Sequence, residues 1–512
     1  MNRTLLLAAC IAFAIVGLAP VAFMFARVGG DGLDALFTER TLTLLGRTAM
    51  LGLGAASTAL VIGVPFGWLT ARTDVFGAPV WRALGILPLV LPPLILAMSW
   101  APMTSLRGGL ATTLLLGIAT FPLVALFTAR AAERIDGRRE EAALMAGGLR
   151  GVVRMELPLL WPSAAAAATF AFVFSVNDFA VPDYVSSIGP KYNVYADEVF
   201  ATWRSSTDSA RAVAAALPLV LLTLLALIPA LELRRRTPLA AFDGDFRSPS
   251  RLRLGVWRLP ALAFVTGVLA LSVFAPLGRL VFESGGGARG FSIANMQASF
   301  GRAIELGRVN LQSSILYAAA AAVLCIPLAI VLGSALGRNA RASRIATYAL
   351  VLPIVVPAIL FGIGNIATWN RPATGALYDS GWMVVILYVG RFAPFAVLAF
   401  AAGRAMLDPR IEEAARMAGA GPLRRLFCIV TPSLWPAILG GATLVYVFSM
   451  RELDAAIFVP SANGTVLFRL YNAVHFGRDD FVAALALLVT FFVVLPGLVW
   501  STFARKRLEV LP

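Results

Sequence analysis

Long uncharged apolar runs recur along the whole chain and are separated by short polar or basic segments. Most runs are close to the ~20 residues with which a helix crosses a ~30 Å hydrocarbon layer. A β-barrel would show short segments of alternating polarity instead. The pattern predicts a polytopic helical membrane protein with about twelve crossings, six in each half of the chain: Leu5–Ala26, Thr48–Ala71, Ala83–Leu106, Gly108–Ala129, Leu157–Asn177, Ala212–Leu231, Leu259–Gly278, Val309–Gly337, Ile345–Asn370, Ser380–Gly403, Thr431–Met450 and Phe481–Ala504.

Composition supports this class. Of the 512 residues, 59% are hydrophobic and only 14% are charged, which excludes a soluble globular domain and a disordered chain. The net charge is +15, and the basic residues that produce it lie between the apolar runs, so membrane topology explains the charge better than nucleic-acid binding does. The basic residues are in excess in alternate loops, which predicts that both termini lie in the cytoplasm.

The chain divides at a polar, basic segment. We expect a first half at 1–233, a cytoplasmic linker at 234–258 and a second half at 259–512. The first run resembles a signal peptide in its position, but it has no convincing cleavage site and is expected to remain as a helix. The three cysteines, Cys10, Cys325 and Cys428, are far apart and are expected to be free thiols.

The two halves repeat one another in their polar loops, where apolar bias cannot explain the likeness. The segment 140–147 reads Glu-Glu-Ala-Ala-Leu-Met-Ala-Gly, and 412–419 reads Glu-Glu-Ala-Ala-Arg-Met-Ala-Gly. A Pro-x-Leu-Trp-Pro stretch follows each, at 158–162 and 432–436. Six crossings is an even number, so the halves have the same orientation and form a parallel repeat.

The repeated segment predicts a short helix followed by a sharp bend. Glu-Glu-Ala-Ala-x-Met-Ala is a strong helix former, and Gly147 or Gly419 permits the positive φ of a tight turn. Pro158 or Pro432 then opens the next crossing at its first turn. The small side chains of this helix allow another protein's backbone to approach closely. An ordinary basic loop is the alternative reading, which two near-identical copies disfavour.

At these residues the chain resembles the permease subunits of bacterial ABC importers, over essentially its whole length. Their EAA loop reads roughly E-A-A-x-x-x-G, followed later by I-x-L-P. The resemblance implies an all-α fold of the type I ABC importer permease, with EAA loops at about 130–158 and 404–432. It also implies that the loop residues contact a cytosolic ATPase: Glu141, Ala142, Ala143, Gly147, Glu413, Ala414, Ala415 and Gly419.

The resemblance further implies the partners. Two copies of an ABC ATPase would bind the two loops, and a periplasmic binding protein would deliver a small solute. The chain itself lacks a G-x-x-x-x-G-K-[ST] loop, since neither Lys191 nor Lys506 stands in such a context. We therefore expect a transport subunit that is not an enzyme and has no cofactor, with ATP and magnesium bound by the ATPase partner.

Two details of the resemblance differ or remain open. Glu413 to Pro432 spans the family's usual 19 positions, whereas Glu141 to Pro158 spans only 17, so the first loop is expected to dock differently. Fused permeases of this length resemble the ferric-iron type, with thiamine and phosphonate importers as alternatives. The stretches 71–77 and 87–93 look most like the iron branch.

Ionisable residues at membrane depth are costly and are candidate functional sites. Arg391 lies in the middle of its run, Asp178 closes the fifth run, and Glu452 is the repeat partner of Asp178 at the end of the eleventh. One hypothesis pairs Arg391 with Glu452 or Asp178 beside the translocation path. In the alternative, these residues lie at helix ends and only set topology.

Two rival functions need different features. A secondary transporter with the same 6+6 repeat has no need for a duplicated Ala/Gly-rich cytoplasmic helix. A membrane-embedded enzyme needs clustered catalytic groups, and the chain has a single histidine, His475, and no nucleophile motif. Asp479 and Asp480 close to His475 suggest metal capture, but a solvated outer loop is the preferred interpretation, and no metal site is expected.

Overall fold

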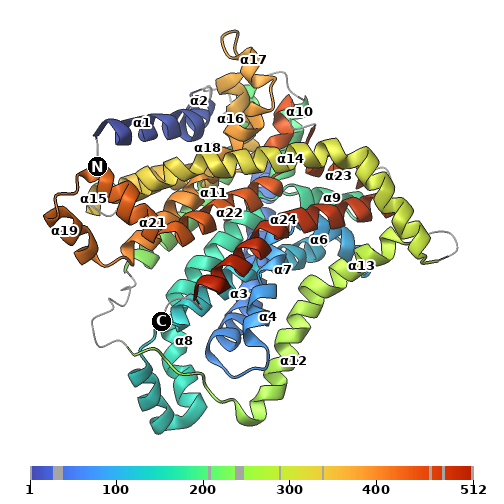
Figure 1. Cartoon of the computed structure of the whole chain (residues 1–512). Helices are drawn as coiled ribbons and strands as arrows, with labels where there is room; N and C mark the ends of the chain where they lie inside the picture. Colours follow the sequence, from blue (N-terminus) through green and yellow to red (C-terminus); the bar gives the residue numbers. More distant parts are fainter. Residues whose placement is uncertain are drawn as a thin grey trace. The chain divides into compact units, whose positions relative to one another are not determined.

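The protein is an all-α polytopic membrane protein (Figure 1). The computed structural model describes residues 3–26, 38–205, 209–236, 247–286, 290–336, 340–460, 464–474 and 479–508. Within these ranges, eight helices are long and apolar enough to cross a membrane: Arg3–Phe25, Glu39–Arg72, Gly108–Ala132, Gly137–Asn177, Gly255–Ser284, Ile293–Ala335, Trp382–Ala405 and Asp480–Val499.

Three further crossings are pairs of helices that meet at a sharp bend. Ala78–Val90 with Pro93–Trp100 bends by 95°, Arg344–Val355 with Ala358–Trp369 by 98°, and Pro422–Ser433 with Trp435–Met450 by 75°. Counting each pair once gives up to eleven crossings in the described part of the chain. The one remaining predicted run, Ala212–Leu231, falls on the shorter apolar helix Ala214–Pro229, so every predicted run coincides with a helix or a bent pair.

The helices of the first half follow one another with short connections. They are α1 (Arg3–Phe13), α2 (Ala19–Phe25), α3 (Glu39–Arg72), α4 (Ala78–Leu84), α5 (Leu87–Val90), α6 (Pro93–Trp100), α7 (Gly108–Ala132), α8 (Gly137–Asn177), α9 (Ala180–Ser187), α10 (Tyr195–Ser205) and α11 (Ser209–Arg236). A π-helical turn at Ala14–Leu18 joins α1 to α2.

The second half repeats this order. Its helices are α12 (Arg258–Leu269), α13 (Ala275–Ser284), α14 (Ile293–Ala335), α15 (Ala340–Val355), α16 (Ala358–Trp369), α17 (Gly375–Tyr378), α18 (Trp382–Ala405), α19 (Pro409–Met417), α20 (Pro422–Arg425), α21 (Thr431–Ser433), α22 (Trp435–Met450), α23 (Val466–Val474) and α24 (Asp479–Leu508). Another π-helical turn, Leu426–Val430, lies between α20 and α21.

By their contacts the helices sort into two compact units. Unit 1 comprises 1–32, 202–214 and 284–512, and unit 2 comprises 33–201 and 215–283. Each unit thus contains the core helices of one sequence half and the first helices of the other. In unit 2, α12 packs against α3 and α4, and in unit 1, α2 packs against α16. The predicted division at 234–258 remains a statement about the sequence repeat, and 237–246 of that linker lies outside the described residues.

Glycines explain why the first helix of the chain belongs to unit 1. A Cβ on Gly390 of α18 would stand 2.1 Å from the carbonyl oxygen of Val16, and one on Gly364 of α16 would stand 2.4 Å from that of Pro20. The backbone of the N-terminal helix therefore lies directly on two glycines of the second half. Close approach of this kind at small residues is a main source of helix association in membranes.

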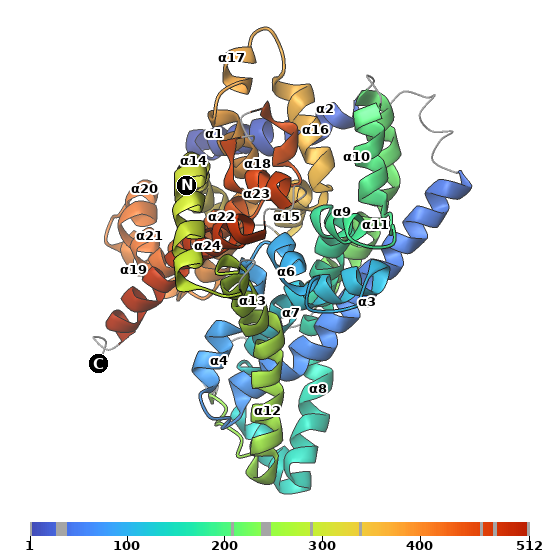
Figure 2. The same ribbon diagram turned by 90° about the vertical axis from the view of Figure 1, so that its right-hand side faces the viewer.

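Glycines also allow α3 to pack closely against α7 in unit 2. Gly63 and Gly67 are four residues apart, on one face of α3. A Cβ on Gly67 would stand 2.3 Å from the carbonyl oxygen of Ala125, and one on Gly63 would stand 2.7 Å from that of Phe121. Figure 2 shows α3, α7 and α8 as the neighbouring long helices of this unit.

The repeat is visible in hydrogen bonds as well as in element order. The Thr48 hydroxyl of α3 accepts from the N–H of Tyr195 at 2.8 Å. The Ser314 hydroxyl of α14 accepts from the N–H of Val466, also at 2.8 Å. A side chain of α3 therefore caps the start of α10, and a side chain of α14 caps the start of α23 in the same way.

Prolines cause two of the bends. Pro92 stands at the α5–α6 break, and Pro357 stands at the α15–α16 break. Proline cannot donate the N–H that an intact helix needs at this point. The predicted crossings Ala83–Leu106 and Ile345–Asn370 are therefore sharply broken and not continuous helices. At membrane depth, such breaks persist only where neighbouring groups satisfy the freed carbonyls.

The α3–α7 contact gives a first prediction. Replacement of Gly67 by valine should destabilise the protein by about 1–3 kcal/mol or more, because the new side chain collides with the backbone of α7. Gly46 lies on the same helix with open space around it, so Gly46→Val is the matched control. Thermal unfolding in detergent measures both. Equal midpoints for the two variants would contradict the packing described.

Candidate functional site

The two EAA loops begin in the same way. The Asp136 side chain accepts from the N–H of Arg138 at the start of α8, and Asp408 accepts from the N–H of Arg410 at the start of α19, both at 2.9 Å. An aspartate at this position satisfies a free N–H of the first helical turn and favours helix formation. The sequence repeat is therefore also a repeat of local structure.

The bends after the two helices differ by one residue. Gly419 has φ +77°, as predicted from its sequence position. In the first loop the positive φ is at Gly148 (+58°), whereas Gly147 has φ −160°, so the prediction of Gly147 was one residue early. No neighbour lies within 4 Å of the Cβ position at Gly148 or Gly419. Glycine is therefore required there by backbone conformation and not by lack of space.

Most of the predicted coupling residues lie on the surface. Glu141, Ala142 and Gly147 are exposed in the first loop, as are Glu413, Ala414 and Gly419 in the second. The third alanine of each motif faces inward: Ala143 is half-buried and Ala415 is buried. Those two alanines contribute to packing within the loop, while the other six residues are exposed.

Sequence reasoning missed one exposed residue in each loop. Met145 is 85% exposed and its repeat equivalent Met417 is 87% exposed. A flexible thioether side chain held in solvent at two equivalent positions is suited to filling a partner's apolar groove. The signal was in the sequence, because methionine is one of the seven identical positions of the repeat.

A buried charge cluster holds the first loop. The Arg72 guanidinium, at the end of α3, forms an ion pair with Glu140 and lies 4.0 Å from Glu156. All three side chains are at most 3% exposed. The Trp68 indole N–H donates to Glu156 at 2.5 Å. The sequence analysis did not select this cluster, although charged residues at the ends of apolar runs were the available signal.

The second loop is held by a more exposed ion pair. Glu412 is the repeat equivalent of Glu140, and it pairs at 2.8 Å with Arg404, near the end of α18. Arg404 also donates to the carbonyl oxygen of Ser334 at 3.0 Å. The side chains of Arg404 and Glu412 are 22% and 37% exposed, so this ion pair is much more accessible to water than the buried pair of the first loop.

The structure brings Arg391 and Glu452 together, as one sequence hypothesis required. Their Nε and Oε2 atoms are 3.5 Å apart, with about a tenth of each side chain exposed. Arg391 also donates to the carbonyl oxygens of Pro353 and Val356, both at 3.4 Å. In an unbroken helix, the carbonyl oxygen of Pro353 would accept from the N–H of residue 357, which is a proline and has none. Arg391 therefore supports the α15–α16 break, and its role beside a translocation path stays a prediction.

Asp178 and Glu452 have the same local role in the two halves. Asp178 follows α8 and accepts from the N–H of Val181 at 2.9 Å, and Glu452 follows α22 and accepts from that of Ala455 at 2.7 Å. Both carboxylates therefore cap the turn after the crossing. Asp178 belongs to unit 2 and Glu452 to unit 1.

Acidic side chains gather around α10 in unit 2. Burial raises the pKa of Asp197 from 3.8 to about 7, and the negative charges of Asp183, Asp178 and Glu198 raise it further against the hydrogen bond from the N–H of Val194. Glu198 is paired with Arg40 at 2.7 Å. Asp197 therefore binds a proton more readily than an ordinary aspartate does.

The remaining candidates add little chemistry. Among the described residues there is no group of three or more metal-binding side chains, and His475 lies outside them. Asp480 pairs with Arg302 at 2.5 Å. The three cysteines are free, as expected.

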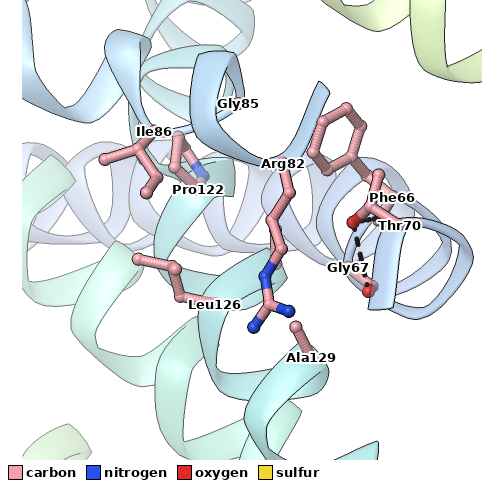
Figure 3. Close-up of a pocket in the computed structure, with 10 residues that line it drawn as sticks. Phe66, Gly67, Thr70, Arg82, Gly85, Ile86, Pro122, Leu126 and Ala129 are labelled. Atoms are coloured by element: carbon pink, nitrogen blue, oxygen red, sulfur yellow. Dashed lines mark hydrogen bonds between the residues drawn. The ribbon is translucent and has the colours of Figure 1, made fainter. Parts of the chain in front are cut away.

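Figure 3 shows a small pocket in unit 2, where Arg82 lies among mainly apolar groups. Its polar groups are engaged: Arg82 pairs with Glu133, and Thr70 bonds to its own helix. The pocket is lined by Phe66, Gly67, Thr70, Arg82, Gly85, Ile86, Pro122, Ala125, Leu126 and Ala129.

The fold and the repeated surface loops define a multi-pass membrane permease. Residues 325–509 match the family described as the binding-protein-dependent transport system inner membrane component. The chain is 24% identical over 477 residues to the ferric transport system permease protein FbpB of Actinobacillus pleuropneumoniae, a match covering 86% of this chain and 67% of that protein. These similarities, which together extend over most of the chain, support an ABC importer permease.

Other relatives match shorter parts. The molybdate/tungstate transport system permease protein WtpB of Pyrococcus abyssi is 28% identical over 197 residues, which is 37% of this chain and 77% of WtpB. The putrescine transport system permease protein PotI of Escherichia coli (strain K12) is 32% identical over 172 residues, which is 33% of this chain and 61% of PotI, less than two thirds of its length. These relatives are named for different substrates, so their similarity to this chain does not identify its cargo.

The ion pair gives a second prediction. Replacement of Arg391 by methionine leaves the Glu452 carboxylate and two carbonyls without their cationic partner, and should destabilise the protein by about 3–5 kcal/mol. Adding Glu452→Gln should recover part of that loss, because the amide keeps the cap on Ala455 without a buried charge. Thermal unfolding of the single and double variants measures the coupling. Arg451→Met is the matched control, and strictly additive effects would rule out the pair.

Asp197 gives a third prediction. Because its pKa is higher in the folded protein than the usual 3.8, the protonated form contributes stability that is lost as pH rises through about 7. Thermal stability of the wild type should therefore fall between about pH 4 and pH 7. Asp197→Asn should flatten this dependence, whereas Asp379→Asn, at an exposed aspartate, should leave it in place. An unchanged profile in Asp197→Asn would contradict the assignment.

Proposed function

We propose that this chain is the fused permease of an ATP-driven importer, with two copies of a cytosolic ABC ATPase bound at its two EAA loops. One observation supports the docking claim above the others. The two EAA loops, far apart in the sequence, each begin with an aspartate-capped helix and end with a bend at a glycine. Each helix also has an exposed glutamate, an exposed alanine and an exposed methionine at the same positions. Two copies of one partner explain why a surface feature occurs twice in one chain.

The chemistry of the loops suits this docking. The exposed alanines allow a partner's backbone to approach, and Met145 and Met417 supply apolar contact at the centre of the surface. ATP-driven closure of the two ATPase copies would move both loops and switch the permease between inward- and outward-facing states. With the loops in the cytoplasm, both chain termini are cytoplasmic as well. ATP and magnesium belong to the ATPase.

For the cargo, we propose ferric iron delivered by a periplasmic binding protein. The ferric permease relative covers 86% of this chain, against 37% and 33% for the molybdate/tungstate and putrescine relatives. Thiamine and phosphonate remain the alternatives from sequence, and putrescine is a cationic alternative among the relatives.

The docking claim gives a fourth prediction. Met417→Asp places a charge at the centre of the proposed contact and should reduce stimulation of the ATPase about tenfold, the effect of ~1.4 kcal/mol of lost binding. Insertion and thermal stability should not change, because the side chain is 87% exposed. Reconstituted complexes, assayed for ATP hydrolysis and for uptake of radioactive ferric iron, provide the measurement.

Two comparisons make this experiment decisive. Met103→Asp is the control, since Met103 is also exposed but precedes α7, at the opposite end of that helix from the first loop. Met145→Asp tests the first loop in the same way. Full stimulation and uptake in Met417→Asp would overturn the docking claim. Uptake of molybdate or putrescine in place of iron would overturn the cargo and leave the docking intact.

A further inference from the structure

The segment Arg247–Leu254, which precedes α12, is an irregular stretch that contacts other parts of unit 2 through backbone hydrogen bonds (Figure 1). The N–H of Leu252 donates to the carbonyl oxygen of Arg72 at 2.7 Å, and that of Asp74 donates to Leu252 at 3.1 Å. These bonds form an isolated parallel bridge between Leu252 and Thr73. At the other end of the segment, the N–H of Gly137 donates to Arg247 at 3.0 Å.

Side chains reinforce these backbone bonds. Arg247 pairs with Glu141 of the first EAA loop at 3.0 Å, and the Asp74 carboxylate accepts from the N–H of Leu254 at 3.0 Å. Leu252 and Leu254 are only 3% and 5% exposed. Leu254 packs with Val75, Ala78 and Ala261. The segment therefore connects three places: the first EAA loop, the α3–α4 connection and α12.

Arg72 lies where these connections meet. Its guanidinium pairs with Glu140 of the loop, lies 4.0 Å from Glu156 of α8, and donates to the carbonyl oxygen of Pro249 in the Arg247–Leu254 segment at 3.4 Å. Separating a buried ion pair leaves an uncompensated charge and is strongly unfavourable. The loop, the end of α3 and this segment are therefore expected to stay together while the protein moves.

The second loop has no matching attachment in the part of the chain that the structure describes. It is held by the ion pair of Arg404 with Glu412, whose side chains are 22% and 37% exposed. The Arg247–Glu141 pair of the first loop is more exposed still, at 63% and 51%, and exposed pairs contribute only about 0–1 kcal/mol. The first loop is therefore distinguished by its backbone hydrogen bonds to Arg247–Leu254 and by the buried Arg72 and Leu252. The two loops present the same surface to a partner but are joined differently to their own helices.

We propose that Arg247–Leu254 is a strap that makes the first coupling loop move as one body with α3 and α12. Arg72 and Leu252 are its positioning residues. This inference rests on the proposed function, because it assumes that the loops receive the ATPase motion. Motion received at the first loop then reaches α12, the first helix of the second sequence half, through the strap.

Hydrogen exchange on the complete permease–ATPase complex tests the strap directly. The amides of Gly137, Asp74 and Leu252 should stay protected both without nucleotide and with a non-hydrolysable ATP analogue. The first loop should also exchange more slowly than the second. Loss of protection at these three amides on addition of the analogue would show that the strap detaches, and would overturn the proposal.

A strap-release variant tests its role in transport. Leu252→Asp places a charge in a buried position, so exchange at Gly137 and Asp74 should rise about tenfold and uptake per ATP hydrolysed should fall several-fold. Arg251→Asp, at the exposed neighbouring position, should change neither quantity. Should Leu252→Asp fail to fold, Asp74→Ala removes the acceptor for Leu254 and replaces it in the test.

The outcomes separate this inference from the proposed function. Raised exchange with unchanged uptake per ATP would overturn the strap's role and leave ATPase docking intact. If the wild-type permease does not bind the ATPase at all, the proposed function itself fails. A lower ratio of uptake to hydrolysis, with the ATPase still bound, supports both.

Discussion

Backbone carbonyls at membrane depth must find donors inside the protein, and the second half of this chain meets that demand with a charge. Pro357 removes the N–H that the Pro353 carbonyl would use, and Arg391 donates to that carbonyl from α18. The guanidinium is itself costly in an apolar environment, and Glu452 compensates it. The broken helix, the arginine and the glutamate therefore depend on one another.

The same reasoning distinguishes the two halves. At the position equivalent to Arg391, counted from the shared proline and Glu-Glu pair, the first half has the small residue Ala119. The strongest buried ion pairing of the first half lies instead at its coupling loop, around Arg72. Among the described residues, the two copies thus have buried ion pairs at non-equivalent positions, so similar loop sequences do not imply the same packing around the loops.

Sequence predicted what depends on local chemistry. Apolar runs located the crossings, and the Glu-Glu-Ala-Ala repeat located two capped helices, because caps and helix propensity act within a few residues. It did not predict the partner of each helix. The N-terminal helix packs on Gly364 and Gly390, and apolar helices resemble one another until such contacts are seen. The bend at Gly148 was missed for a related reason, since either of two adjacent glycines can adopt a positive φ.

The two-residue difference in loop length has a structural counterpart. In the second half, a turn at 418–421 separates α19 from α20, and the π-helical turn Leu426–Val430 then uses more residues per turn than an α-helix would. In the first half, Gly147 and Gly148 form the whole bend within the helical span of α8. The shorter first loop therefore has fewer residues with which to change its conformation. It is also the loop to which Arg247–Leu254 is bound. A short connection and an external tie both stiffen the same element, which makes the first loop the more rigid of the two points where an ATPase would act.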